Sequence, residues 1–526
     1  MGDARPPERR KHVAGVDYEH VGAEYLEERR LSRAAGVALI WGLGVGYVIS
    51  GEYFGWNFGL AAGGWGGLLV ATVFIAIMYA TMIFAIAEMA TALPATGGPY
   101  AFARRALGPW GGYVTGLAVT FEYVIAPAVI AVGIAGYILG LPWWAEEAAD
   151  IPFWVPYLIA AVFYAVFIGI NLLGAQESLR TLFVITGVSV VVLILWGLAM
   201  LPHIDWSNLS DVAVDSNRAG ASRFFPLGFL GIWAAMPAAA WFYLAIEGVP
   251  LAAEEVRDPA RDMPKGMILA MFSLIAFSAI SLFIGPAVAG SEALGGSGNP
   301  LPQAAESAVG ENWLFYVITI IGLTGLVASF FSIIFAYSRQ IFALSRAGYF
   351  PRRLSTVNPR HVPARALIIP GLIGWVVIVL VDVFNRMSAR ESGQSLTEAA
   401  PEVATGDLLI QIAVFSALIS YVAMMVSFIV LRRKEPDLER PYRTPGGVTT
   451  ATVALVLALV AMGSAFVYGT KPAITISATI LFFVLGLAYF GLNTRHKLVA
   501  EAPEEEFAVI AKAEAELEVP PERTPT

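Results

Sequence analysis

Long apolar stretches separated by short polar connections run along almost the whole chain. A helix that crosses a bilayer needs about 20 mostly apolar residues, and its backbone groups must be hydrogen-bonded internally. Strands of a membrane barrel would instead alternate apolar and polar positions over about 10 residues, which is not the pattern here. The pattern therefore predicts an all-α integral membrane protein. Twelve spans are expected, at residues 34–59, 65–93, 110–140, 152–173, 181–202, 226–254, 265–289, 312–345, 364–385, 406–431, 449–469 and 472–493.

Spans one and six are too long for one straight crossing, and each has a break near its centre that carries a glutamate. The first apolar stretch runs from about 33 to 63, and the sixth from about 225 to 257. In the first, glycines at 42, 44 and 46 interrupt the helix, and Ile49, Ser50 and Gly51 break it just before Glu52. In the sixth, the stretch 245–248 lies between two prolines and contains Glu247.

Interrupted helices in corresponding positions, five spans apart, are the trace of an inverted repeat. The spacing predicts that spans 1 to 5 and 6 to 10 are related by a pseudo-two-fold axis. An acid at membrane depth marks an ion or substrate pathway more often than a simple anchor. The two breaks therefore predict a transporter whose site lies at the midplane of the membrane.

Composition and charge exclude several other classes. The chain has 526 residues, of which 57% are hydrophobic and 14% charged, and its mean hydropathy is +0.68, outside the range of ordinary soluble proteins. The net charge of −8 gives no basic groove for nucleic acid. There is no cysteine, so disulfides and thiolate metal sites are excluded. The first 30 residues contain no apolar segment typical of a cleaved signal peptide.

The distribution of basic residues predicts the orientation. With the amino terminus inside, the cytosolic connections carry 22 Lys and Arg between 29 and 497, against five in the external ones. By the positive-inside rule both termini are cytosolic, in a multi-pass protein of the plasma membrane. Four segments are expected: a cytosolic segment 1–33, a transporter core 34–431, spans 11 and 12 with their linker at 432–497, and a disordered tail 498–526.

Three stretches with motif character resemble the amino acid–polyamine–organocation transporter superfamily. They are AEMATALPATGGPYAFARRALGPWGG (87–112), AIEGVPLAAEEVRDPARDMPKG (245–266) and YSRQIFALSRAGYFPRRLSTVNPRHVPA (337–364). The sequence of the broken first helix, ISGEYFGWN (49–57), looks like that of the ethanolamine permease branch. The resemblance implies five-plus-five inverted repeats with two extra helices, alternating access, and a site between helices 1, 3, 6 and 8.

The position of Glu52 indicates the class of substrate. In relatives that carry amino acids, backbone amides of the broken first helix hold the substrate carboxylate. A fixed anion beside those amides repels a carboxylate, so the expected substrate is a cation without one, such as ethanolamine or a choline-like amine. Either Glu52 or Glu247 binds the amine, and Tyr243 shares a helical face with Glu247 at i, i+4. The expected lining residues are Ile49, Ser50, Gly51, Glu52, Tyr53, Tyr123, Trp241, Tyr243, Ala245 and Glu247.

The coupling ion is less determined by the sequence. Ser329 and Ser332 are the hydroxyls available for sodium, although serines in membrane helices commonly bond their own backbone. No lysine occurs between 181 and 202, where some proton-coupled relatives carry one. Proton coupling or exchange through Glu247 or Glu122 is favoured, since burial disfavours a charged carboxylate. Glu122 either lines the pathway or pairs within the bundle, and Glu88 is a structural or gating residue.

Two alternatives stay open. One is an amino acid permease of the same superfamily, with Glu52 pointing away from the site. The other is a receptor that binds an amine without moving it. The sequence has no motif of a hydrolase or metalloenzyme, and its five histidines all lie outside the spans. No enzyme activity, cofactor or metal is predicted.

Overall fold

Helices dominate the structure, a computed structural model that describes residues 11–13, 15–19, 21, 25, 35–94, 97–141, 151–391, 401–466, 472–500 and 502–503. Within these residues, nine helices are long and apolar enough to cross a membrane. Three shorter apolar helices, Val37–Val48, Val155–Asn171 and Val448–Ser464, fall where spans one, four and eleven were predicted. A helical multi-pass membrane protein is therefore confirmed, while the count of twelve spans and the inverted repeat stay predictions.

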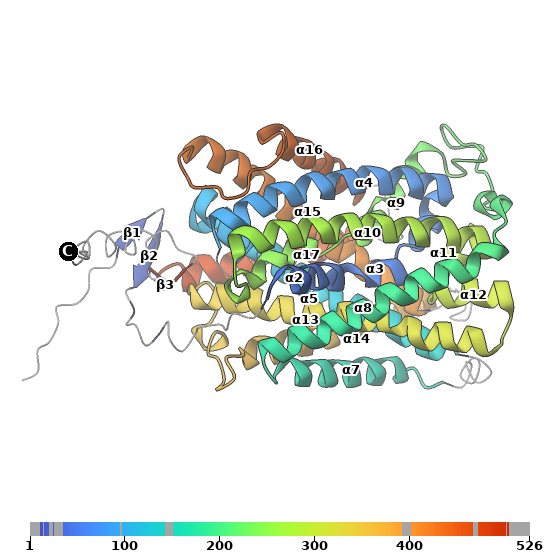
Figure 1. The fold of residues 1–526 in the computed structure, drawn as a ribbon, viewed down its shortest axis with the longest axis horizontal. Coiled ribbons are helices and arrows are strands. Elements are labelled where there is room, and N and C mark those ends of the chain that lie inside the picture. The colour runs from blue at the N-terminus through green and yellow to red at the C-terminus, as the bar shows by residue number, and fades with distance from the viewer. Residues whose placement is uncertain are drawn as a thin grey trace, which may run out of the picture.

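The longer helices run roughly along one axis of the molecule (Figure 1). The α-helices are α2 (Val37–Val48), α3 (Ser50–Tyr53), α4 (Phe58–Ala92), α5 (Pro99–Leu139), α7 (Val155–Asn171), α8 (Ala175–Met200), α9 (Gly228–Trp241), α10 (Pro259–Ala289), α11 (Ser291–Gly295), α12 (Pro300–Val309), α13 (Trp313–Arg346), α14 (Ala364–Glu391), α15 (Pro401–Lys434), α16 (Val448–Ser464) and α17 (Pro472–Tyr489). Short 3₁₀ helices are η2 (Leu201–His203), η3 (Trp206–Ser210), η4 (Ile246–Glu255) and η5 (Arg352–Leu354), and η6 (Phe490–Thr494) is a π-helix.

Two of these helices change direction at a glycine with positive φ. Gly64 has φ 67° inside α4, and Gly108 has φ 81° inside α5. A Cβ at Gly64 would lie 2.3 Å from Cγ of Pro226. Only glycine adopts this backbone readily, so Gly64 marks the corner between the first and second predicted spans.

The three alternating glycines of the first span do not interrupt it, contrary to the prediction. Helix α2 continues through Gly42, Gly44 and Gly46. A Cβ at Gly42 would lie 2.7 Å from the ring of Phe183 on α8, and one at Gly44 would lie 2.8 Å from Cβ of Ala270 on α10. These glycines let neighbouring helices approach closely, which is a common use of small residues in membrane bundles.

A three-stranded sheet, which was not predicted, lies beyond one end of the bundle (Figure 1). Strand β1 (Lys11–Val13) pairs antiparallel with β2 (Val16–Glu19), and β2 pairs parallel with β3 (Leu498–Val499). The amide of Val499 donates to the carbonyl of Ala347, just after α13, at 3.0 Å. Strand β3 thus lies at the first two residues of the predicted tail, and the division into four segments stays a prediction. Residues 504–526 of that tail lie outside the described residues.

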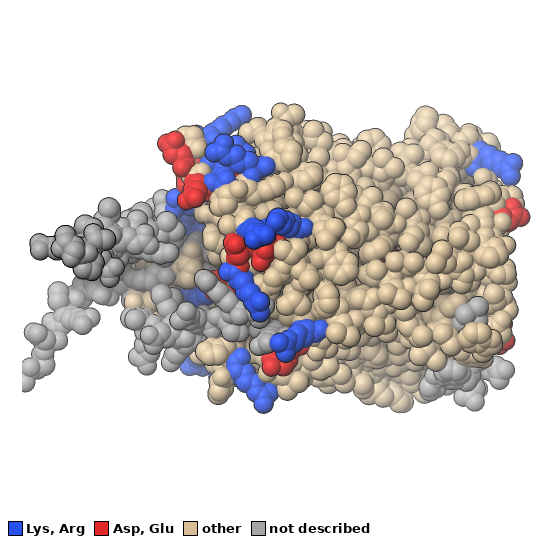
Figure 2. Space-filling model, in the orientation of Figure 1, with Lys and Arg blue, Asp and Glu red and all other residues tan. Residues whose placement is uncertain are grey.

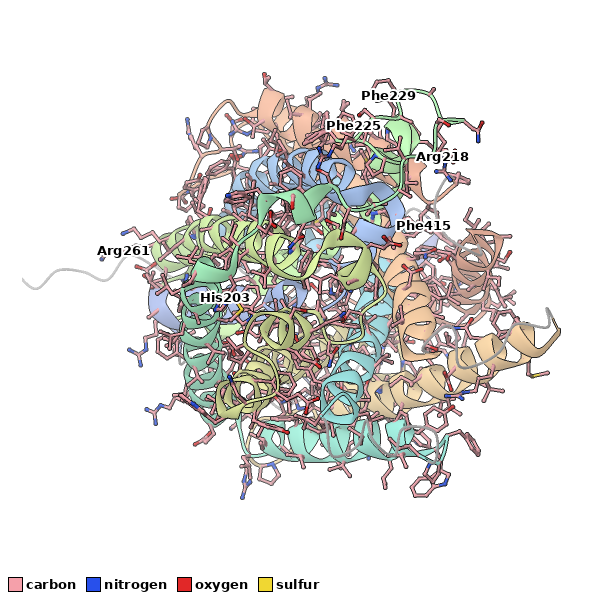
Figure 3. The ribbon with its side chains drawn as sticks, turned by 90° about the vertical axis from the view of Figure 1, so that its right-hand side faces the viewer. His203, Arg218, Phe225, Phe229, Arg261 and Phe415 are labelled. Atoms are coloured by element: carbon pink, nitrogen blue, oxygen red, sulfur yellow. The ribbon has the colours of Figure 1, made fainter. Side chains whose placement is uncertain are left out.

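Charged side chains gather at the ends of the visible face and leave its centre uncharged (Figure 2). Most of the visible Lys and Arg side chains lie at the end that carries the sheet. Viewed from the opposite end, the connection between α8 and α9 crosses the bundle, from His203 on one side to Arg218, Phe225 and Phe229 on the other (Figure 3). An uncharged belt between charged ends is the surface expected of a protein embedded in a bilayer.

Candidate functional site

The first span is broken later than predicted. Ile49 separates α2 from α3, but its backbone stays near helical values (φ −58°, ψ −19°). The chain leaves the helix at Phe54 (φ −158°, ψ 147°), and Gly55 takes a left-handed φ of 94°. The side-chain oxygen of Asn57 accepts the amide of Gly55 at 3.0 Å. The main break therefore follows Glu52 instead of preceding it.

The sixth span is broken where the sequence indicated, although the break begins earlier. Helix α9 ends at Trp241, and a turn then leads to the 3₁₀ helix η4 at Ile246. Ala245 has a left-handed φ of 80° without being glycine. Such a backbone costs about 1–3 kcal/mol and tends to occur at functional positions. The prediction of a break near Glu247 is confirmed.

The two breaks touch each other. A Cβ at Gly51 would lie 2.5 Å from the carbonyl oxygen of Trp241 and 3.1 Å from Cα of Phe242. The indole of Trp241 donates to the carbonyl of Phe54 at 2.9 Å, and Trp56 stacks on Phe242 with ring centroids 5.7 Å apart. Backbone that has left the helix in one span is thus partly hydrogen-bonded by the other span, as membrane depth requires.

Glu52 lies in α3 next to this contact and is fully buried. Among the described residues, neither of its carboxyl oxygens has a hydrogen-bond partner. Its backbone carbonyl accepts the hydroxyl of Ser281 on α10 at 2.8 Å, and its carboxyl interacts electrostatically with Tyr53 and Tyr243. A buried carboxyl without a partner is costly, and such a group in a native protein calls for a ligand, a proton or a water.

Glu247, unlike Glu52, has a hydrogen-bond partner at each of its carboxyl oxygens. The phenol of Tyr123 on α5 donates to one carboxyl oxygen at 2.8 Å, and the phenol of Tyr421 on α15 donates to the other at 2.9 Å. Glu122, the next residue to Tyr123 on α5, is also fully buried, and neither of its carboxyl oxygens has a hydrogen-bond partner among the described residues. The structure therefore brings Tyr123, Tyr421 and Glu247 together and places Glu52 outside this group.

The predicted pairing of Tyr243 with Glu247 does not form. Tyr243 lies in the turn after α9, so the helical i, i+4 alignment is lost. Its hydroxyl bonds the hydroxyl of Ser278 on α10 at 2.7 Å. The hydroxyl of Tyr53 likewise donates to a protein group, the carbonyl of Ser189 on α8, at 2.6 Å. The hydroxyls of both tyrosines are therefore hydrogen-bonded to other groups of the protein.

The two serines considered for sodium are bonded to backbone. Ser329 on α13 accepts the amide of Ser50 and donates to the carbonyl of Gly46, both at 2.8 Å. Ser332 donates to the carbonyl of Ala328. The hydroxyl of Thr186 on α8 lies beside Gly46 and has no partner among the described residues. Three hydroxyl oxygens, a ligand type that suits a hard cation, thus lie near Gly46. Those of Ser329 and Ser332 are already hydrogen-bonded to backbone carbonyls.

Glu88 lies in an ion-pair cluster at the end of α4. It pairs with Arg432 at 2.6 Å and Arg440 at 3.1 Å, and it accepts the amide of Thr444 at 2.7 Å. These contacts tie α4 to the end of α15 and to the segment that follows. The role of Glu88 as a structural or gating residue stays a prediction.

Several residues of the centre were missed from the sequence. Tyr421 and Tyr79 form a bonded pair, with their hydroxyls 3.1 Å apart, beside Glu247. Both are single tyrosines within apolar spans, where a packing role is the ordinary reading. Ser281 and Thr186 were missed for a similar reason. Nothing in the local pattern distinguishes them from serines and threonines that bond their own helix.

The sequence is similar to a family of transporters over most of its length. The family model described as amino acid permease matches residues 35–490. An uncharacterised transporter of Rhizobium meliloti (strain 1021) is 28% identical over 474 residues, covering 89% of this chain and 94% of the relative. The branched-chain amino acid permease of Bacillus subtilis (strain 168) is 26% identical, covering 89% and 94%. The methylthioribose transporter of the same strain is 24% identical, covering 87% and 92%.

Proposed function

The chain belongs to the amino acid permease family, and on that premise we propose that it is a secondary transporter of a small amine cation. The substrate class is ethanolamine or a related amino alcohol such as choline, and the route is alternating access across the plasma membrane. The five-plus-five repeat and the cytosolic termini belong to the same proposal. The gathering of basic side chains at the end with the sheet supports that orientation (Figure 2).

The unpartnered carboxyl of Glu52 carries the proposal. It is fully buried beside the contact between the two broken spans. An ammonium group brought to it would supply both the missing charge and hydrogen-bond donors. The nearby rings of Tyr53 and Tyr243 add aromatic faces, each worth about 0.5–2 kcal/mol to a cation that lies over it.

The backbone amides near the first break supply a second, independent argument. The amide of Ser50 donates to Ser329 at 2.8 Å, and that of Glu52 donates to the carbonyl of Ile49 at 3.1 Å. The amides of Phe54 and Gly55 are also bonded within the protein. A substrate carboxylate would therefore find these four amides occupied, which favours a substrate that has none.

A proton is proposed as the coupling ion in preference to sodium. The hydroxyls of Ser329 and Ser332 are bonded to backbone, so a sodium ion would have to displace those bonds. Glu122 and Glu247 are both fully buried, and burial disfavours a charged carboxylate, so either acid is able to take up and release a proton.

An amino acid carrier is the second candidate, and the relatives favour it. Two of them are named as branched-chain amino acid permeases, from Bacillus subtilis (strain 168) and from Lactococcus lactis subsp. cremoris (strain MG1363). In that case the substrate ammonium would meet Glu52, and its carboxylate would need an amide or hydroxyl other than the four amides described above.

Uptake by purified protein in sealed proteoliposomes separates the two candidates. We expect labelled ethanolamine to accumulate and to be displaced by unlabelled ethanolamine or choline, but not by leucine or alanine. Accumulation inside sealed vesicles also distinguishes a transporter from a receptor. Accumulation of labelled leucine that unlabelled ethanolamine does not displace, with no accumulation of labelled ethanolamine, would reject the amine reading in favour of an amino acid carrier.

The variant Glu52→Gln tests the residue itself. A hydrogen bond to a charged group is worth about 1.5–3 kcal/mol, so ethanolamine binding is expected to weaken by about tenfold or more. Glu306→Gln is the matched control, because that side chain is exposed on α12. Equal ethanolamine affinity in the two variants, measured by thermal shift, would show that Glu52 does not hold the amine.

A further inference from the structure

The three-stranded sheet joins the segment before the first span to the segment after the last one (Figure 1). Strand β2 lies parallel to β3, with Tyr18 opposite Leu498. The amide of Ala500 donates to the carbonyl of Glu19 at 3.1 Å. The strands have three, four and two residues, which is too short for a sheet that is stable by itself. The sheet therefore depends on the helices against which it packs.

The sheet packs on the ends of α5 and α13 that lie beside it. The four residues of β2 and β3 that form its buried side are 0% exposed, and they belong to one apolar cluster with residues of both helices: Val16, Tyr18, Leu498 and Val499. The phenol oxygen of Tyr18 also accepts a hydrogen bond from the guanidinium of Arg104 on α5. Removal of these apolar side chains from water holds the sheet on the bundle.

Polar contacts fix the sheet to the segment that follows α13. The amide of Val499 donates to the carbonyl of Ala347 at 3.0 Å. The guanidinium of Arg352 on η5 donates to the carbonyl of Lys497 at 2.7 Å and pairs with Glu19 at 2.9 Å. Arg352 thus contacts the segment before the first span and the segment after the last span at once.

The same end of α13 holds the end of η4 through two ion pairs. Arg346, the last residue of α13, pairs with Glu254, with Nη1 3.0 Å from Oε2. Arg339, about two turns earlier, pairs with Glu255 at 2.8 Å. Residues about two turns apart lie on the same face of a helix, so one face of α13 binds both acids of η4.

The end of η4 is bonded in turn to the start of the first span. The amide of Ala35 donates to the carbonyl of Glu255 at 2.9 Å, and the amide of Arg257 donates to the carbonyl of Ala35 at 2.9 Å. Both broken spans therefore meet at this end of the molecule, where α13 holds them through Glu254 and Glu255.

The backbone that carries Arg346 is held by segments from outside the spans. The hydroxyl of Tyr25, which packs on the same apolar cluster as the sheet, donates to the carbonyl of Arg346 at 2.8 Å. The next carbonyl, that of Ala347, accepts the amide of Val499. Two successive carbonyls at the end of α13 are thus fixed from both sides of the sheet. The position of the guanidinium that binds Glu254 depends on these contacts.

Building on the transport function proposed above, we propose that this sheet is a clasp that keeps the cytosolic side of the transporter closed. The clasp consists of β1, β2 and β3 together with Tyr25. While the clasp is docked, Arg346 holds η4 on α13. When the clasp leaves α13, η4 and the start of the first span separate from α13 and open the site to the cytosol. The clasp binds no substrate and sets how often this opening occurs.

Maleimide labelling of purified protein tests the clasp without any transport. The sequence contains no cysteine, so one introduced thiol reports on one position. Ala253 on η4 is 1% exposed and precedes Glu254, so Ala253→Cys should react slowly with a water-soluble maleimide. The labelling rate follows the fraction of protein that is open at this position.

Two further substitutions should speed this labelling. Leu498→Asp places a charge in the buried side of β3 and should raise the rate by about tenfold or more. Arg352→Gln removes a partly exposed ion pair and should raise the rate by about twofold to fivefold. Arg360→Gln is the matched control, because this arginine is exposed on the same connection between α13 and α14. Equal labelling rates in all four proteins would overturn the clasp.

A disulfide across the sheet tests the opposite direction. Glu19 and Val499 are opposite each other in parallel strands, whose spacing of about 5 Å is within the range that a disulfide spans. Oxidation of the Glu19→Cys/Val499→Cys protein should lower ethanolamine uptake by about fivefold or more, and reduction should restore it. Binding of ethanolamine by thermal shift should persist. The two single variants should not respond to oxidation, and unchanged uptake after complete disulfide formation would overturn the clasp.

The two proposals fail differently. Amine uptake together with labelling rates that ignore Leu498→Asp and Arg352→Gln would overturn the clasp and leave the amine transporter standing. A protein that moves no amine would reject the transport function, while the labelling rates of Ala253→Cys would still confirm or refute the hold of the sheet on η4.

Discussion

Gly51 is the position at which the contact between the two broken spans is most sensitive to one added atom. A Cβ there would lie 2.5 Å from the carbonyl oxygen of Trp241 and 3.2 Å from its carbonyl carbon. Both atoms are backbone, so no side-chain rotation relieves the overlap. The two breaks would have to separate by about 1 Å, and overpacking of this kind costs about 1–3 kcal/mol.

Gly51→Ala is therefore expected to lower the apparent melting temperature in detergent and to abolish amine uptake. Gly187→Ala on α8 is the matched control, because a Cβ there meets no heavy atom within 4 Å. Alanine in a helix interior is favoured over glycine by about 0.5–1 kcal/mol, so this control should melt no lower than the unsubstituted protein. If Gly51→Ala melts and transports like Gly187→Ala, the breaks do not touch, and the reasoning is refuted.

Three further predictions concern other parts of the molecule. Arg339→Met should destabilise the protein by about 3–5 kcal/mol, because it leaves Glu255 buried without its ion partner; adding Glu255→Leu should restore most of the melting temperature, and no recovery would contradict the pairing. Gly248→Ala should lower melting temperature and uptake, because the new Cβ would lie 2.3 Å from the hydroxyl of Tyr123; adding Tyr123→Phe should recover the melting temperature, and failure of that rescue would argue against the contact. The pKa of Asp205 lies below its ordinary 3.8, because a serine hydroxyl and amide donate to its carboxylate. The ionised form stabilises the folded state, so Asp205→Ala should melt lower than the unsubstituted protein above about pH 4, and the difference should fade as pH falls through the folded pKa; a difference that does not change with pH would contradict this cause.

The local pattern was sufficient to predict the helices and the presence of two breaks. Apolar length reports membrane spans because an unpaired backbone is too costly in a bilayer. Prolines at 237 and 250 and the glutamates at 52 and 247 marked the interrupted spans from residue types alone. The predicted position of the first break was wrong, because Ile49 remains nearly helical and the sharp turn comes only at Phe54 and Gly55. The alternating glycines were misread as a break because close packing and interruption use the same residue.

The partners of the acids were decided by tertiary structure. Tyr421 reaches Glu247 across 174 positions and Tyr123 across 124, and no periodicity within a span encodes such distances. The expected pairing of Tyr243 with Glu247 assumed a continuous helix, whereas the turn after α9 directs Tyr243 to Ser278 instead. The sequence by itself determined that acids would lie at membrane depth beside broken helices. Helix packing decided that Glu247 is held by two phenols while Glu52 is left without a hydrogen-bond partner among the described residues, because side-chain partners in a bundle depend on which faces of distant helices meet.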